Sequence, residues 1–222
     1  MTCVHCKEAD RVFNPRMGKS ELKSYRRKGP SKSTRRIIEA VIATNRKGTT
    51  LIDIGGGVGA IYHELLNEFV SSAIHVDAAE NYLSLARLES TRRGTQNRVQ
   101  FIKGDFVDIS TELPSSDIIT LDKVVCCYPN IDSLLSTVAS KSTGLVVLSL
   151  PREWLLIKFM VKTMNFVRKL SKNAFRNYVY SMSEISDILE KGGFTRTAFE
   201  VSGIWQIFVF EKVPENKKVF TS

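Results

Sequence analysis

The stretch Leu51-Ile-Asp-Ile-Gly-Gly-Gly-Val-Gly-Ala-Ile61 decides how the rest of the sequence is interpreted. A short apolar run ends in glycines, and an apolar pattern with helical spacing follows it. Glycines at such a junction let the backbone turn sharply and approach a ligand closely. The start of the next helix adds free N–H groups and partial positive charge. The stretch therefore predicts a strand, loop and helix that together bind a ligand.

Strand-like runs and helical patterns alternate from Thr49 onward, which is typical of a mostly parallel sheet with helices on both faces. Near the end, Ser202-Gly203 separates two strand-like runs and predicts a hairpin with an antiparallel edge. We expect strands at Leu51–Ile54, Ala73–Val76, Val99–Ile102, Asp117–Leu121, Leu145–Leu150, Thr195–Val201 and Ile204–Glu211. We expect helices at 31–47 (capped by Ser33 or Thr34), Ile61–Val70, Tyr82–Arg92, Ile131–Ser140 and Ser183–Lys191.

The composition is that of a globular protein with a single domain. Of the 222 residues, 43% are hydrophobic and 25% are charged, and a typical domain has about 150 residues. The sequence has no uncharged apolar run of about 18 residues, so we expect no membrane-spanning helix. Residues 1–10 lack the apolar core of a secretory signal, so a cytoplasmic location is the default expectation.

The net charge of +9 is carried by the first part of the chain. Residues 1–47 hold thirteen Lys/Arg against four Asp/Glu, whereas residues 48–222 hold nineteen of each sign. We interpret 1–30 as a solvated, partly mobile basic arm, 31–213 as the domain and 214–222 as a loose tail. An anionic partner for the arm, such as RNA, is the alternative.

Acids stand at the ends of the first three predicted strands. Asp53 could receive an ammonium group, but it is a poor neighbour for a pyrophosphate. Asp77 is placed for the two hydroxyls of a ribose, which nicotinamide and adenosyl cofactors share. Asp105 could accept the exocyclic amine of adenine, and Phe106 could pack on its ring. The structural alternatives are helix caps or anchors for Asp53 and Asp77, and plain core packing for Phe106.

With these elements in this order, the sequence resembles class I S-adenosylmethionine-dependent methyltransferases from about Thr49 to Lys212. The resemblance implies a Rossmann-like three-layer α/β sandwich with a seven-stranded, mostly parallel sheet and an antiparallel C-terminal strand. It also implies S-adenosylmethionine as the cofactor. It assigns cofactor binding to Asp53, Gly55, Gly56, Gly57, Gly59, Asp77, Ala78, Gly104, Asp105, Phe106 and Leu121.

The acceptor is expected beyond the fourth and fifth strands. Asp122 is the best-placed acid there, either as a cofactor contact or base, or in a structural pair with Lys123. Tyr128 could bind the acceptor and donate a hydrogen bond, or pack in the core. Tyr128-Pro129-Asn130 is not the family's motif for exocyclic amines of nucleobases, which disfavours adenine or cytosine amines. We interpret Cys126 and Cys127 as small apolar residues with reduced thiols.

An apolar segment with interspersed basic residues follows the fifth strand over Pro151–Leu170. It could form a packed helix, a lid over a hydrophobic acceptor within an insert at 152–182, or a helix on a membrane surface. Together with Tyr128-Pro129, the segment resembles the magnesium-protoporphyrin O-methyltransferase group. This thinner resemblance implies a small, largely apolar acceptor with oxygen as the acceptor atom.

Other functions remain open at this point. Gly55-x-Gly57-x-x-Ala60 also satisfies the dinucleotide fingerprint, but Asp53 and the terminal hairpin argue against a nicotinamide-dependent oxidoreductase. An RNA methyltransferase and a non-catalytic cofactor-binding subunit are the remaining alternatives. Cys3-Val-His-Cys6 is half of a zinc pattern without a second cysteine pair, so no metal is expected. His5, His63 or His75 could complete a zinc site only through the fold, and the oligomeric state is not readable from the sequence.

Overall fold

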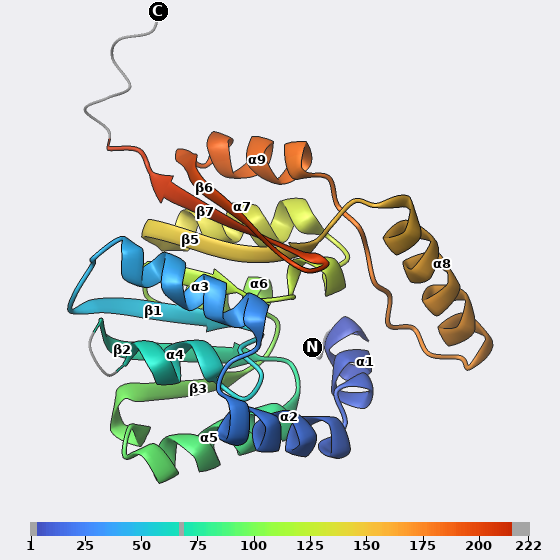
Figure 1. The fold of residues 1–222 in the computed structure, drawn as a ribbon, viewed down its shortest axis with the longest axis horizontal. Helices are drawn as coiled ribbons and strands as arrows, with labels where there is room; N and C mark the ends of the chain where they lie inside the picture. The colour runs from blue at the N-terminus through green and yellow to red at the C-terminus, as the bar shows by residue number, and fades with distance from the viewer. Residues whose placement is uncertain (1–3, 67–68, 215–222) are drawn as a thin grey trace, which may run out of the picture.

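The computed structural model describes residues 4–66 and 69–214. Its strands are β1 (Thr49–Ile54), β2 (Val70–Asp77), β3 (Val99–Lys103), β4 (Ser116–Leu121), β5 (Ser142–Pro151), β6 (Phe194–Ser202) and β7 (Trp205–Lys212). Within these residues the strands form a seven-stranded sheet in the order β3-β2-β1-β4-β5-β7-β6 (Figure 1). The neighbours from β3 to β5 pair in parallel, whereas β7 runs antiparallel to both β5 and β6. The predicted fold class is confirmed.

Helices cover both faces of the sheet. The α-helices of the described residues are α1 (Val4–Val12), α2 (Pro15–Lys28), α3 (Lys32–Ala43), α4 (Ala60–Leu65), α5 (Glu80–Arg93), α6 (Phe106–Ile109), α7 (Ile131–Lys141), α8 (Leu155–Leu170) and α9 (Met182–Lys191). Leu51 of β1 packs with Ile37 of α3 and Ile61 of α4 in one buried cluster. The next residue, Ile52, belongs to a second cluster with α7 and α9. Successive strand side chains point to opposite faces, so one strand supplies both cores.

Residues 4–28 are two packed helices, which corrects the expectation of a loose arm over 1–30. Asn14 caps α2 by accepting from the backbone N–H groups of Arg16 and Met17, and a proline follows the cap. Leu22 and Tyr25 point inward from α2 and are buried. Arg26 donates to the fully buried carboxylate of Glu89 on α5 at 2.8 Å. These contacts fix the basic segment against the domain, although the charge pattern alone predicts a solvated arm.

Two helix boundaries also differ from the sequence analysis. The first predicted helix of the domain is capped by Ser31, whose hydroxyl accepts from the backbone N–H of Thr34, and not by Ser33 or Thr34 themselves. The helix predicted at Ile61–Val70 ends at Leu65, and Val70 begins β2. Val70 has apolar helical spacing, but pairing with Thr49 of β1 places it in the sheet.

Helix α8 stands away from the body of the sheet and its covering helices (Figure 1). In the part of the chain that the structure describes, no helix has the length and apolar character needed to cross a membrane. The predicted tail at 214–222 lies outside the described residues, apart from Pro214.

Candidate active site

A cavity of about 1100 Å³ opens at the carboxyl ends of β1, β2 and β4. This is the edge at which ligands bind in open parallel sheets. Predicted site residues that line the cavity are Gly55, Gly56, Gly57, Asp77, Ala78, Gly104, Asp105, Phe106, Asp122 and Tyr128. The fold therefore brings most of the predicted site residues to one place.

The glycine loop after β1 forms the floor of the cavity. Gly55 and Gly57 have φ values of 60° and 57°, in the left-handed region that favours glycine. A Cβ on Gly55 would lie 2.5 Å from a methyl carbon of Val124, so the loop also packs closely against the segment after β4. The backbone N–H of Gly55 donates to the carbonyl of Val76 at 2.7 Å, which ties the loop to the neighbouring strand.

Asp77 holds the loop from the end of β2. One carboxylate oxygen accepts from the backbone N–H of Gly57 at 3.1 Å, and the other accepts from the N–H of Ala79 at 2.8 Å. The N-cap residue of α5 is Ala79, so Asp77 does not cap that helix. The carboxylate is thus fixed in the cavity wall beside the glycines.

Asp105 and Phe106 follow β3 as predicted. Asp105 caps α6 by accepting from the N–H of Val107 at 2.9 Å, and it also accepts from the hydroxyl of Tyr128 at 2.7 Å. Phe106 belongs to the core cluster and is 2% exposed, yet it lines the cavity. Tyr128 therefore links the segment after β4 to the segment after β3, and both segments line the cavity.

Three of the predicted cofactor residues, Asp53, Gly59 and Leu121, are not part of the cavity lining. Asp53 is fully buried beneath the loop, where it accepts from the hydroxyl of Thr120 at 2.7 Å. A Cβ on Gly56 would lie 2.6 Å from the second carboxylate oxygen of Asp53, so the loop backbone separates this acid from the cavity. Asp53 thus supports the loop from behind.

Burial raises the pKa of Asp53 from 3.8 to about 7, although His75 and Thr120 oppose the shift. Because the folded state holds this proton more tightly than the unfolded state, protonated Asp53 stabilises the fold. This contribution to the free energy of unfolding is fully present below pH 3.8 and is lost as the pH rises through 7. Asp53→Asn removes this titration. When the pH is raised from 5 to 8, we expect the free energy of unfolding of the variant to rise relative to that of the wild type by roughly 2–4 kcal/mol. Urea unfolding at both pH values checks this, and parallel pH profiles would contradict it.

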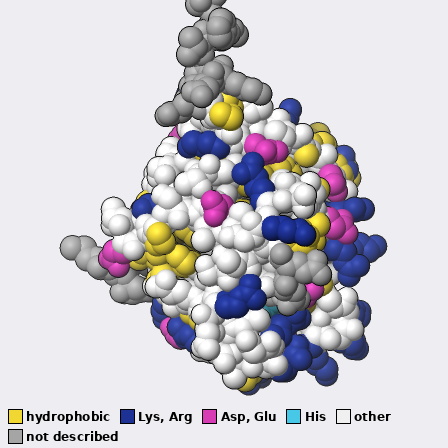
Figure 2. All heavy atoms as spheres, turned by 90° about the vertical axis from the view of Figure 1, so that its left-hand side faces the viewer, with side chains coloured by type: hydrophobic (Ala, Val, Ile, Leu, Met, Phe, Trp, Pro, Cys, Tyr) yellow, Lys and Arg dark blue, Asp and Glu magenta, His cyan; other side chains and the backbone are white. Residues whose placement is uncertain are grey.

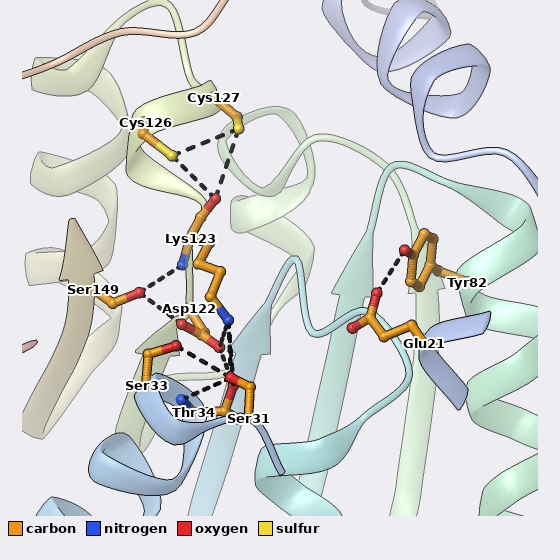
Figure 3. A network of polar contacts seen from close by, with 10 residues as sticks. All are labelled: Glu21, Ser31, Ser33, Thr34, Tyr82, Asp122, Lys123, Cys126, Cys127 and Ser149. Atoms are coloured by element: carbon orange, nitrogen blue, oxygen red, sulfur yellow. Dashed lines mark hydrogen bonds and ion pairs between the residues drawn. The ribbon is translucent and has the colours of Figure 1, made fainter. Parts of the chain in front are cut away.

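Asp122 lies at the centre of a polar network that joins β4, β5 and the start of α3 (Figure 3). The hydroxyls of Thr34 and Ser149 each donate to its carboxylate at 2.6 Å. The ammonium group of Lys123 lies 3.1 Å from the oxygen that Thr34 contacts. The structural pairing with Lys123 that the sequence left open is therefore present, within a wider network.

Glu21 is a cavity residue that sequence reasoning missed, because its helix was assigned to the arm. Its carboxylate accepts from the hydroxyl of Tyr82 at 2.7 Å (Figure 3). The other oxygen lies 3.5 Å from the position of a Cβ on Gly57, beside the glycine loop. Burial raises its pKa, with Tyr82 and Lys123 opposing the shift. Asn14-Pro15, a cap followed by proline, was the available signal for this helix.

Aromatic residues from distant segments close the cavity on the side of α1. Phe13 and Phe175 meet edge to face with ring centroids 5.7 Å apart, and both line the cavity. Phe175 is 2% exposed and lies in the segment after α8, within the insert predicted at 152–182. No residue of α8 lines the cavity, so in this structure the segment after the helix, and not the helix, covers the site.

The cysteines and histidines form no metal cluster among the described residues. Cys126 and Cys127 have free thiols with sulfur atoms 3.7 Å apart. His63 is fully buried, and burial lowers its pKa from 6.5 to about 3. Of the half zinc pattern, Cys3 lies outside the described residues and the side chain of Cys6 is not described.

Comparison with known families and structures identifies the type of domain. A family model described as "Methyltransferase domain" matches residues 45–193, more than half of the chain. No sequence match was found among curated proteins.

Solved structures with the same fold include a magnesium protoporphyrin IX methyltransferase from Synechocystis PCC 6803 with bound SAH. Its TM-score is 0.71 and its sequence identity is 16%, over 92% of this chain and 98% of that chain. An O-methyltransferase family protein from Burkholderia thailandensis has a TM-score of 0.68 and 12% identity over 92% of this chain and 62% of that one. A chain from a complex that contains the Haloferax volcanii Trm112 methyltransferase activator has a TM-score of 0.68 and 11% identity, over 91% of this chain and 96% of that one. At these identities, the likeness extends to the fold.

Proposed function

Since this chain belongs to the methyltransferase domain family, we propose that it transfers a methyl group from S-adenosylmethionine to oxygen on a small, largely apolar acceptor. The methyltransferase domain implies S-adenosylmethionine as the methyl donor, in agreement with the sequence analysis. The observation that carries the proposal is the meeting of the glycine loop, Asp77 and Asp105 in one cavity. These groups come from the ends of three neighbouring strands.

The residues of the cavity fit this cofactor. Gly55 and Gly57 have positive φ values and line the cavity, so the loop backbone can approach a ligand closely there. We assign Asp77 to the ribose hydroxyls, and Asp105 with Phe106 to the adenine, because all three residues line the cavity. Glu21, on the cavity side of the loop, is a better partner for the amino-acid ammonium group than the enclosed Asp53. A cavity of about 1100 Å³ has room for an acceptor beside the cofactor.

The chemistry is an in-line displacement. When bound, S-adenosylmethionine would supply a methyl group on a positively charged sulfur. An acceptor oxygen would bond to the methyl carbon as the carbon–sulfur bond breaks, which would leave S-adenosylhomocysteine, and the proton of the acceptor would pass to solvent. The protein aligns the acceptor and excludes water. Tyr128 and Asp122 stay our candidates on the acceptor side because both line the cavity. The three donors around Asp122 favour a positioning role, since its oxygens already accept hydrogen bonds.

An apolar acceptor is supported by the apolar side chains of the cavity. Phe13, Phe175, Val124 and Leu134 contribute to its lining. Phe13 and Phe175 come from segments that lie 162 positions apart in sequence, so the acceptor side forms only when the N-terminal helices and the segment after α8 pack together. The basic N-terminal segment is thereby part of the cavity wall. This structural role explains the presence of the segment without an RNA partner.

Calorimetry with the full chain tests the proposal. We expect S-adenosylmethionine to bind with a Kd near 1 μM, about −8 kcal/mol, and NAD to show no measurable binding. Release of S-adenosylhomocysteine in the presence of small apolar alcohols, phenols and carboxylic acids then tests the transfer. Binding of NAD in preference to S-adenosylmethionine would refute the methyl-donor assignment. Cofactor binding without turnover on any acceptor would favour the non-catalytic subunit, and salt-sensitive RNA binding with turnover on RNA would favour the RNA methyltransferase.

A further inference from the structure

Helix α8 exposes an apolar face that no described part of the chain covers. Its side chains include Leu155, Phe159, Phe166 and Leu170, which are 86%, 67%, 62% and 70% exposed. Only Ile157 is buried in this helix of sixteen residues. Soluble monomers rarely expose a contiguous apolar patch of this kind, and such patches mark interaction sites. The exposed apolar face of α8 is therefore a candidate interaction site.

The helix has separate inner and outer faces. Ile157, Val161, Asn165 and Arg168 recur at intervals of three or four residues and are its less exposed positions. Asn165 and Arg168 fasten this inner face to the following segment through hydrogen bonds to Asn177. The apolar side chains of the outer face are exposed, and they are those of Leu155, Leu156, Phe159, Met160, Phe166, Val167 and Leu170.

A polar residue within the outer face is already hydrogen-bonded. Thr163 donates its hydroxyl to the carbonyl of Phe159 at 3.0 Å, inside the helix. An apolar environment can therefore surround the outer face without leaving that hydroxyl unsatisfied. The helix begins after Trp154, which is 47% exposed and stacks beneath the guanidinium group of Arg152 at 3.8 Å. Tryptophan with a neighbouring cation is typical of the boundary between water and lipid.

The charge of α8 has one sign. Lys158, Lys162 and Lys169 fall together on one edge, between the inner and outer faces, because the helix advances 100° per residue. The helix contains no Asp or Glu. Lysine is depleted from the cores of protein interfaces, whereas a row of lysines beside an apolar face complements the headgroups of anionic lipids.

The outer face also contrasts with the opposite side of the molecule. There, hydrophobic side chains form small separate groups between charged side chains of both signs (Figure 2). We propose that α8 is an interfacial helix that docks the protein on the surface of an anionic lipid bilayer. The outer face enters the boundary between headgroups and acyl chains, the three lysines contact the headgroups, and the helix lies in the surface plane. This binding site is independent of the proposed methyl transfer.

Sedimentation of the full chain with lipid vesicles tests the proposal. The vesicles are phosphatidylcholine alone, and an equal mixture of phosphatidylcholine and phosphatidylglycerol. We expect binding to the mixed vesicles that weakens with added salt, and little binding to phosphatidylcholine alone. The double variant Phe159→Glu/Phe166→Glu is expected to lower the partition coefficient at least tenfold. Leu88→Glu adds a carboxylate at a 54% exposed leucine on α5, away from α8, and this control should bind like the wild type.

Charge is tested separately. Replacing Lys158, Lys162 and Lys169 by glutamine should weaken binding to mixed vesicles about a hundredfold, since each lysine near an anionic surface contributes a factor of roughly five. The triple variant Lys23→Gln/Lys47→Gln/Lys191→Gln removes the same charge from exposed sites elsewhere and should bind far better.

The outcomes are decisive. The proposal would be overturned if the wild type did not bind the mixed vesicles. It would also be overturned if the Phe159→Glu/Phe166→Glu variant bound them as well as the wild type does. Concentration-dependent dimerisation that this variant abolishes, without vesicle binding, would instead make a second copy the occupant. Calorimetry should give the variant the cofactor affinity of the wild type, so a failed methyl-donor assignment and a failed lipid assignment are distinguished.

Discussion

Replacing Asp77 by alanine is expected to weaken S-adenosylmethionine binding by about 1–3 kcal/mol, which corresponds to a 5- to 150-fold rise in Kd. In the proposed complex the carboxylate accepts hydrogen bonds from the ribose. It also holds the backbone N–H groups of Gly57 and Ala79 at 3.1 and 2.8 Å, so the substitution loosens the glycine loop as well. Calorimetry with the cofactor measures the effect directly.

Asp108→Ala is the control for this experiment, because Asp108 is an exposed acid on the neighbouring helix α6. Its loss changes the net charge equally and should leave the Kd unchanged. Thermal unfolding of both variants separates a binding defect from a folding defect. If the Asp77 variant folded normally and bound the cofactor like the wild type, Asp77 would no longer belong to the binding site.

Gly59→Ala is expected to have the largest effect on stability, lowering the free energy of unfolding by about 2–5 kcal/mol. Gly59 has a φ of 82°, which costs a residue with a Cβ about 1–2 kcal/mol. That Cβ would lie 2.1 Å from the hydroxyl oxygen of the fully buried Tyr62, and overpacking of this kind costs about 1–3 kcal/mol more. Urea unfolding measures the sum.

Gly48→Ala separates strain from crowding. Gly48 has a similar φ of 71°, but a Cβ there would meet no atom within 4 Å. We expect this control to lose only the conformational part, about 1–2 kcal/mol. Equal losses in the two variants would show that Tyr62 adjusts freely. That result would contradict the close packing assigned to the start of α4.

The strands were the most predictable part of the molecule. All seven predicted strands are present, and Thr195–Val201 and Ile204–Glu211 differ from β6 and β7 by one residue at each end. Apolar runs bounded by turn residues are local signals, so they can be recognised without knowing the neighbours of a strand. Helix ends were harder, as Val70 demonstrates, because apolar spacing does not distinguish a helix from the strand that follows it.

The candidate site was predictable only where it is close in sequence to strand ends. Asp77 ends β2, whereas Asp105 and Asp122 lie just after β3 and β4, and all three line the cavity. Asp53 fits the same rule but is enclosed beneath the loop, because its side chain points to the buried side of the turn. Its direction depends on the conformation of the glycines after it, which no local pattern encodes.

The amino-acid pattern alone determined a parallel α/β sheet with a glycine turn, since alternation and strand-end residues act within a few positions of one another. The packed state decided what surrounds that turn. Glu21 and Phe175 join the cavity through contacts with Tyr82 and Phe13, each more than sixty positions away in sequence. Such contacts gain their free energy from burial that only the assembled fold provides, so a basic segment that looks solvated becomes part of the cavity wall.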